Sequence, residues 1–147
     1  MKISYKLFLL FLFPAFTQAQ DFEGQIDSNA VTLEKCLEKG YHDPYMKKCY
    51  LKASEDLDLL LNTIYKKTTP LLKKADQIEF RNNQRKWLSF YNSENQFNQK
   101  VFWSQNSDEK YQFGTLVDLS IAANNYKILK NRVETLSSYY TILTTGL

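Results

Sequence analysis

The side chains best suited to acid–base, nucleophilic or metal chemistry are few in this sequence, and their spacing fits none of these roles. The single histidine, His42, lies between the two cysteines, Cys36 and Cys49. One imidazole and two thiols fall short of a structural zinc site, which almost always has four ligands. The motifs H-E-x-x-H and G-x-S-x-G and a glycine-rich phosphate loop are absent. We therefore predict no catalytic residue, no metal and no cofactor.

Acidic residues are plentiful, and a facing pair of carboxylates is the machinery of most glycoside hydrolases. In this chain they fall in stretches that favour helices, where carboxylates usually face solvent. We therefore expect a protein that is not an enzyme. The acids considered are Glu34, Glu38, Glu55, Asp56, Asp58, Glu94, Asp108 and Glu109.

The N-terminus predicts export. Lys2 and Lys6 precede a ten-residue apolar run from Leu7 to Phe16, and Thr17-Gln18-Ala19 supplies small residues before a cut. This is the layout of a secretory signal peptide. The run has half of the roughly 20 residues that a membrane-spanning helix needs. We expect residues 1–19 to be removed and the rest to be soluble, in the periplasm or secreted, with no membrane span.

Export places Cys36 and Cys49 in an oxidising compartment, where an isolated pair this close usually forms a disulfide. Closing a loop of this size stabilises a fold by about 3 kcal/mol in the loop-entropy description. We therefore predict one structural disulfide.

The charge of the chain is modest. The formal net charge of +3 includes the two leader lysines, so the exported part is close to neutral. The basic residues recur at helical spacing rather than in one tract, as on a solvated helix face. We predict no nucleic-acid partner.

Composition favours helices over sheets, because the chain has four glycines and three prolines and its apolar residues recur at steps of three and four. We predict an all-α fold, a small antiparallel helical bundle in one domain. The expected domain covers residues 31–142 and follows a flexible polar segment, residues 20–30.

Capping and breaking residues give the expected helix boundaries. Gly40 suits the end of a short helix over 31–39. Asp43 is the expected cap of a second helix, from Pro44 to about Lys67, and Thr69-Pro70 predicts a break or kink. A third helical segment is expected to carry Phe80, Gln84, Trp87 and Tyr91 on one face. Residues 97–107 have the weakest pattern, and Asn106-Ser107-Asp108 predicts a loop. A last helix is expected from Leu116 to about Tyr140.

Three patterns occur in order along the chain: the cysteine pair; D-x-x-L-N-x-x-Y at residues 58–65; and Gln84-Arg85-Lys86-Trp87, four residues after Phe80. Together they resemble the family of LprI-type lysozyme inhibitors over about Cys36 to Leu136. The arginine of that family's last helix corresponds to Arg132. Polar motif residues at a helix–helix seam can hydrogen-bond across it, so we interpret the motif as structural rather than partner-binding. Its residues are Asp58, Leu61, Asn62, Tyr65, Gln84, Trp87 and Arg132.

The departures from the family pattern concern a second pair of cysteines. Asn95 and Asn124 stand where the family has them. The resemblance therefore implies a single disulfide, Cys36–Cys49, and a C-terminal helix tied less firmly to the body.

The resemblance implies an exported binding protein that inhibits a lysozyme or related peptidoglycan hydrolase by covering its surface. The alternatives are an immunity or envelope-assembly module with a different protein partner, or a structural protein of the envelope. Two aromatic segments are candidate contact surfaces. One is the disulfide-braced turn with Tyr41, His42, Asp43 and Tyr45, and the other is Phe97 to Trp103. The competing interpretation is that the tyrosines only pack the turn.

Overall fold

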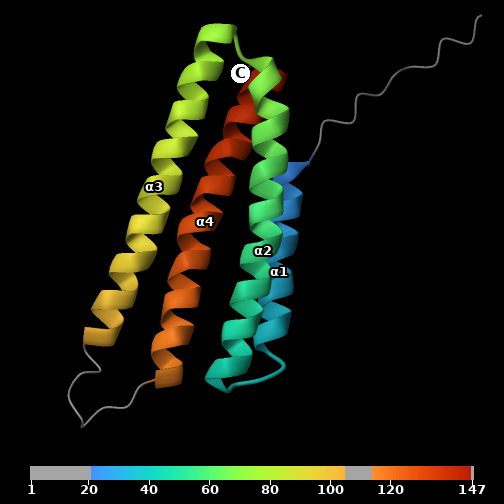
Figure 1. The fold of residues 1–147 in the computed structure, drawn as a ribbon. Helices are drawn as coiled ribbons and strands as arrows, with labels where there is room; N and C mark the ends of the chain where they lie inside the picture. Colours follow the sequence, from blue (N-terminus) through green and yellow to red (C-terminus); the bar gives the residue numbers. More distant parts are fainter. Residues whose placement is uncertain (1–20, 105–113, 147) are drawn as a thin grey trace, which may run out of the picture.

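The computed structural model describes residues 21–104 and 114–146, and these parts of the chain are helical throughout apart from short turns. The four helices are α1 (Phe22–Leu37), α2 (Asp43–Thr68), α3 (Lys74–Ser104) and α4 (Gly114–Thr145). A short 3-10 helix, η1 (Thr69–Leu71), follows α2 directly. The helices alternate in direction, so the prediction of an antiparallel helical bundle is confirmed (Figure 1).

The core lies mainly between α2 and α4, which share the most extensive interface of the bundle. Leu57 and Ile64 of α2 and Val133 and Leu136 of α4 are fully buried there. Helix α1 packs chiefly on α2, while α3 lies on the outer side of α4 (Figure 1). Of the 31 residues in α3, Phe80 and Gln84 are buried. The bundle is thus a three-helix core with α3 attached along its edge.

Helix α1 begins much earlier than expected, so the prediction of a flexible segment is wrong for residues 22–30. Phe22 and Ile26 are 2% and 3% exposed, and the Phe22 ring meets Tyr140 edge-on at 4.9 Å between centroids. Asp21 caps the helix by accepting a hydrogen bond from the backbone N–H of Gly24 at 2.7 Å. Burial of two large apolar side chains outweighs the polar composition of this stretch.

The boundaries of α2 match their prediction within one residue, but the capping residue differs. His42 rather than Asp43 is the N-cap, because its Nδ1 accepts a hydrogen bond from the backbone N–H of Tyr45 at 3.3 Å. At the other end the chain breaks rather than kinks. Helix α2 ends at Thr68, η1 contains Pro70, and α3 starts afresh at Lys74.

Helix α3 continues through Phe97 to Trp103, where the pattern is weakest, and the predicted loop at Asn106-Ser107-Asp108 lies outside the described residues. Helix α4 is two residues longer at its start than expected and reaches Thr145. Although it lacks a second disulfide, α4 supplies half of the main interface of the bundle. The loosely packed helix is α3.

Candidate functional site

The predicted disulfide is present and braces one end of the bundle. Cys36 in the last turn of α1 is bonded to Cys49 in the second turn of α2, with their Cα atoms 5.8 Å apart. The two cysteines enclose a short turn between the helices. This turn therefore has little freedom to move relative to either helix.

The four residues predicted for the turn lie together, but they have different surroundings. Tyr41 is 87% exposed, more than any other large hydrophobic side chain in the described residues. Tyr45 is half-buried, and its ring lies 5.6 Å from that of His42, edge to face. Asp43 accepts a hydrogen bond from Thr115 Oγ1 at 2.9 Å, which ties the turn to the start of α4. His42, Asp43 and Tyr45 thus hold the turn, and Tyr41 projects from it.

Gly40 is required by a close approach rather than by a left-handed helix end. Its φ is not positive, in contrast to Gly146. A Cβ at Gly40 would lie 2.8 Å from Cδ1 of Tyr45. A side chain at Gly40 would therefore displace the Tyr45 ring and disturb the turn.

The second predicted segment, Phe97 to Trp103, lies at the same end of the bundle as the turn (Figure 1). Trp103 borders a crease of about 340 Å³ between α2, α3 and α4. Lys47 and Asp118 also line this crease and form an ion pair that joins α2 to α4. The two candidate surfaces predicted from separate stretches of sequence are thus parts of one end of the molecule.

The first half of the family motif does not form the seam that we expected. Asn62 Nδ2 donates to the backbone oxygen of Asp58 at 2.8 Å and to its Oδ2 at 3.2 Å, within α2, and both residues are exposed. Leu61 is buried in the core, and Tyr65 stacks on Phe80 with ring centroids 5.0 Å apart. Leu61 and Tyr65 of D-x-x-L-N-x-x-Y thus pack in the bundle, while Asp58 and Asn62 hydrogen-bond within α2.

The second half of the motif does lie at a seam, between α3 and α4. Arg132 donates from Nη2 to Gln84 Oε1 at 2.7 Å and to Asn83 Oδ1 at 2.7 Å. Its guanidinium carbon lies 5.6 Å from the centroid of the Trp87 ring. Burial lowers the pKa of Arg132. In the described part of the chain no carboxylate lies within ion-pair distance of this guanidinium.

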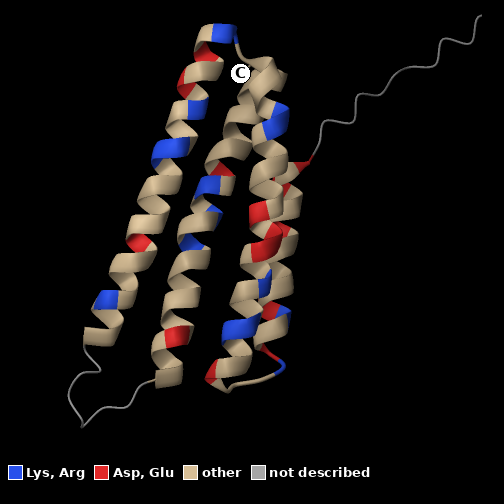
Figure 2. Cartoon of the chain, viewed as in Figure 1, with Lys and Arg blue, Asp and Glu red and all other residues tan. Residues whose placement is uncertain are grey.

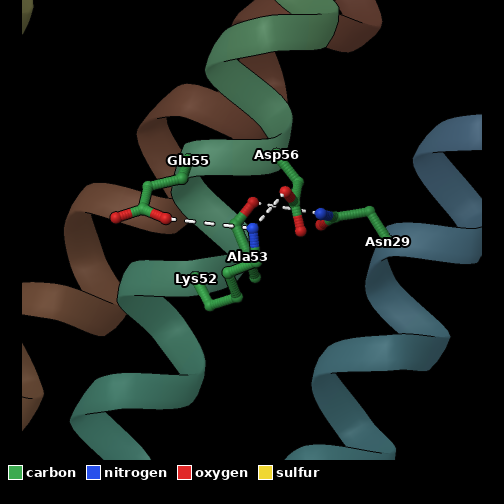
Figure 3. Close-up of polar contacts among 5 residues, drawn as sticks. All are labelled: Asn29, Lys52, Ala53, Glu55 and Asp56. Atoms are coloured by element: carbon green, nitrogen blue, oxygen red, sulfur yellow. Dashed lines mark hydrogen bonds and ion pairs between the residues drawn. The ribbon is translucent and has the colours of Figure 1, made fainter.

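A polar bridge that the sequence analysis missed joins three helices. Asn29 in α1 donates from Nδ2 to the backbone oxygen of Ala53 in α2 at 3.0 Å (Figure 3). Its Oδ1 accepts a hydrogen bond from the hydroxyl of Tyr126 in α4 at 3.1 Å. Burial is the main cause that raises the pKa of Tyr126. The sequence contains a pattern that could have revealed this bridge. Phe22, Ile26 and Leu33 recur at helical spacing, and Asn29 falls on the same face of that helix.

A cluster of charged side chains lies next to this bridge on the outer face of α2 (Figure 3). Lys52 pairs with Asp56 at 2.8 Å and with Glu55 at 3.9 Å (Figure 3). The hydrogen bond to Asp56 is the main cause that raises the pKa of Lys52. All three belong to one helix face, where such pairs give only small stabilisation. They form a solvated helix surface rather than a catalytic pair of acids.

Within residues 21–104 and 114–146 there is no group of three His, Cys, Asp or Glu side chains placed to hold a metal ion. Over the same residues, no helix combines the length and the apolar character needed to cross a membrane. The same residues form a projecting tyrosine, a braced turn and an aromatic-edged crease at one end of the bundle.

Comparison with protein families agrees with the motif order. A family model described as lysozyme inhibitor LprI matches residues 36–136, from the first cysteine to a buried leucine of α4. Comparison with curated proteins and with solved structures gives no match.

Proposed function

The chain belongs to the LprI family of lysozyme inhibitors, and on that premise we propose that it binds a lysozyme or related peptidoglycan hydrolase and covers the substrate cleft of the enzyme. We also propose that the leader, residues 1–19, exports the protein to the periplasm or the exterior, where such enzymes act on the wall. Inhibition of this kind needs no catalytic group. It needs a rigid surface that fits the partner.

The observation that carries the proposal is the exposure of Tyr41 on a turn that is fixed on both sides. The disulfide holds the turn to α1 and α2, and the Thr115–Asp43 hydrogen bond holds it to α4. A backbone that is already fixed loses little conformational entropy on binding, so the cost that remains is mainly that of ordering the Tyr41 side chain. Aromatic side chains are also the residues that most often dominate binding energy at interfaces.

The chemistry of a lysozyme cleft suits such a group. These enzymes work with two carboxyl groups that flank the scissile bond. A phenol offers a hydrogen-bond donor to a carboxylate and an apolar ring to the sugar-binding surface beside it. Trp103 and the exposed Phe97 at the same end of the bundle extend the contact area.

The direct test is a clearing assay on a suspension of cell walls, with purified mature protein, residues 20–147, added in increasing amounts to lysozymes of several structural types. Slower clearing that reaches a plateau near equimolar protein supports the proposal. Calorimetry with the same enzyme should give a matching stoichiometry. Unchanged clearing at large excess with every lysozyme type would exclude the proposal and leave the protein as a binding module for another partner.

A further inference from the structure

The end of the bundle opposite the braced turn exposes an apolar surface. The last buried residues of α4 are Leu136 and Ser137, yet the helix continues to Thr145. Beyond Ser137, Ile142 and Leu143 are 51% and 40% exposed, because α2 has already ended at Thr68 and the neighbouring elements cover them only in part. Leu71 of η1 is also exposed. This end therefore places aliphatic side chains in contact with solvent.

These side chains border a hollow of about 210 Å³ where η1, the start of α3 and the end of α4 meet. The exposed lining of the hollow is entirely apolar. The hydroxyl of Thr68 donates a hydrogen bond to the backbone oxygen of Ile64 at 2.8 Å, within α2. The residues around the hollow are Thr68, Leu72, Phe80, Tyr139, Ile142 and Leu143.

Four lysines surround the same end. Lys66 and Lys67 lie in the last turn of α2, and Lys73 and Lys74 lie just before and at the start of α3. All four are exposed, and none forms an ion pair within the described residues, whereas Lys52 does. Figure 2 shows basic residues at the end of α2 and the start of α3.

Two acids, Asp76 and Glu79, follow within the first two turns of α3, and both are exposed. Asp21 and Glu23 lie at the same end, because Phe22 between them packs on Tyr140. With Arg81, the basic residues of this end outnumber its four acids by one. The positive charge is concentrated in residues 66–74, which hold the four lysines and no acid. Its natural complement is a surface that is both anionic and able to accept aliphatic side chains.

We propose that this lysine-rimmed apolar end docks onto the surface of a bilayer that contains anionic lipids. Ile142 and Leu143 enter the boundary between headgroups and acyl chains, and the ammonium groups of Lys66, Lys67, Lys73 and Lys74 contact lipid phosphates. Reversible association of this kind needs both an apolar anchor and a basic patch, and this end has both. The protein lies on the membrane and does not span it.

This inference goes beyond lysozyme inhibition and does not depend on it. The lipid-facing end and the Tyr41 turn are at opposite ends of the helices (Figure 1). A membrane-bound molecule therefore points its braced turn away from the bilayer, where a soluble enzyme can reach it. Loss of one activity should leave the other intact.

The test is co-sedimentation of the mature protein with vesicles of equal parts phosphatidylglycerol and phosphatidylcholine, compared with phosphatidylcholine alone. At about 0.1 M salt we expect at least about tenfold stronger binding to the anionic vesicles, falling steeply at about 0.5 M salt. The variant K73E/K74E should lose most of this binding. The matched control K35E/K39E, which reverses two exposed lysines at the other end, should bind like the wild type.

The apolar half of the proposal is tested by I142S/L143S, which should weaken vesicle binding while the protein keeps its helical circular dichroism spectrum, since both side chains are about half exposed. F90S removes an exposed aromatic from α3 and serves as its control. Equal binding by wild type and K73E/K74E, or no difference between the two vesicle types, would overturn the proposal. So would a wild-type dimer that I142S/L143S converts to a monomer, because the surface would then be an interface between two copies.

Discussion

Gln84 accepts two hydrogen bonds from Arg132 at a single oxygen, with Oε1 lying 2.7 Å from Nη2 and 3.0 Å from Nε. Both residues are buried. The attachment of α3 to the core thus depends on the guanidinium of Arg132. This group donates hydrogen bonds to side-chain amide oxygens and packs over the ring of Trp87, and no described carboxylate pairs with it. A buried charge with neutral partners tolerates little loss of hydrogen bonding.

Replacement of Gln84 by Leu should therefore lower the free energy of unfolding by about 2–4 kcal/mol, because it removes two of the acceptor contacts of a buried charge. Urea denaturation followed by circular dichroism measures the change. Asn82→Leu, at an exposed position two residues earlier, is the matched control and should change stability by less than about 0.5 kcal/mol. A Gln84→Leu protein as stable as the control would show that Arg132 does not hold the α3–α4 seam.

Tyr126 gives a prediction about pH. Burial raises its pKa above the ordinary value near 10.0 in the folded protein. The folded state therefore keeps the proton more firmly than the unfolded state, so this contribution to stability is complete below pH 10 and is lost as pH rises through the folded-state pKa. Tyr126→Phe should be about 1 kcal/mol less stable than the wild type at pH 8, since the hydrogen bond to Asn29 is lost.

The difference in melting temperature between the wild type and Tyr126→Phe should then become smaller above pH 10. Only the wild type loses stability there, because its buried phenol resists ionisation in the folded state. Melting temperatures of both proteins from pH 8 to about pH 11.5 test this. Tyr41→Phe, with an exposed ring, controls for general alkaline effects. Parallel curves for the wild type and Tyr126→Phe would contradict the prediction.

The disulfide should contribute about 3 kcal/mol to stability, the value expected for closing a loop of roughly this length. The variant C36S/C49S, or the wild type in a reducing agent, should show a lower urea midpoint by the corresponding amount. Reduction should leave the C36S/C49S protein unchanged. If the oxidised and reduced wild-type proteins unfold at the same midpoint, the brace has no thermodynamic role.

Tyr41 is expected to be a major contact with the inhibited enzyme. Tyr41→Ala should raise the inhibition constant about 30-fold, the effect of losing an interaction of about 2 kcal/mol at an interface, without a change in melting temperature. Leu59→Ala removes an exposed apolar side chain from the middle of α2 and should inhibit like the wild type. Equal inhibition constants for the two variants would place the contact surface elsewhere on the molecule.

Much of this architecture could be predicted from sequence because helix signals are local. Pro44 and Pro70 mark the limits of α2, and the apolar stripe from Cys49 to Ile64 identifies its buried face. The cysteine pairing followed from compartment and count. The family resemblance inferred from motif order is confirmed by the match over residues 36–136.

What the sequence did not predict depends on contacts between distant segments. The stretch from Phe22 to Ala30 looks polar alone, and its helix is stabilised by Tyr140, Ala53 and Tyr126, which no local pattern reveals. The placement of the two aromatic segments at one end likewise depends on helix direction and length. Asp58 and Asn62 were assigned to a seam because both are polar motif residues, but their side chains bond within one helix turn.

The shallow attachment of α3 has a consequence for how the protein opens. After Gln84, no residue of α3 is buried. Two of its side-chain amide atoms, Asn95 Oδ1 and Asn98 Nδ2, are inaccessible to solvent and have no hydrogen-bond partner among the described residues. Hydrogen exchange should therefore divide the molecule into two units. Amides of α2 and the middle of α4 should exchange only through global unfolding, while those of the distal half of α3 should exchange through a local opening of much lower free energy. Among the described helices, that half of α3 should also be the first to be cut by a protease under native conditions.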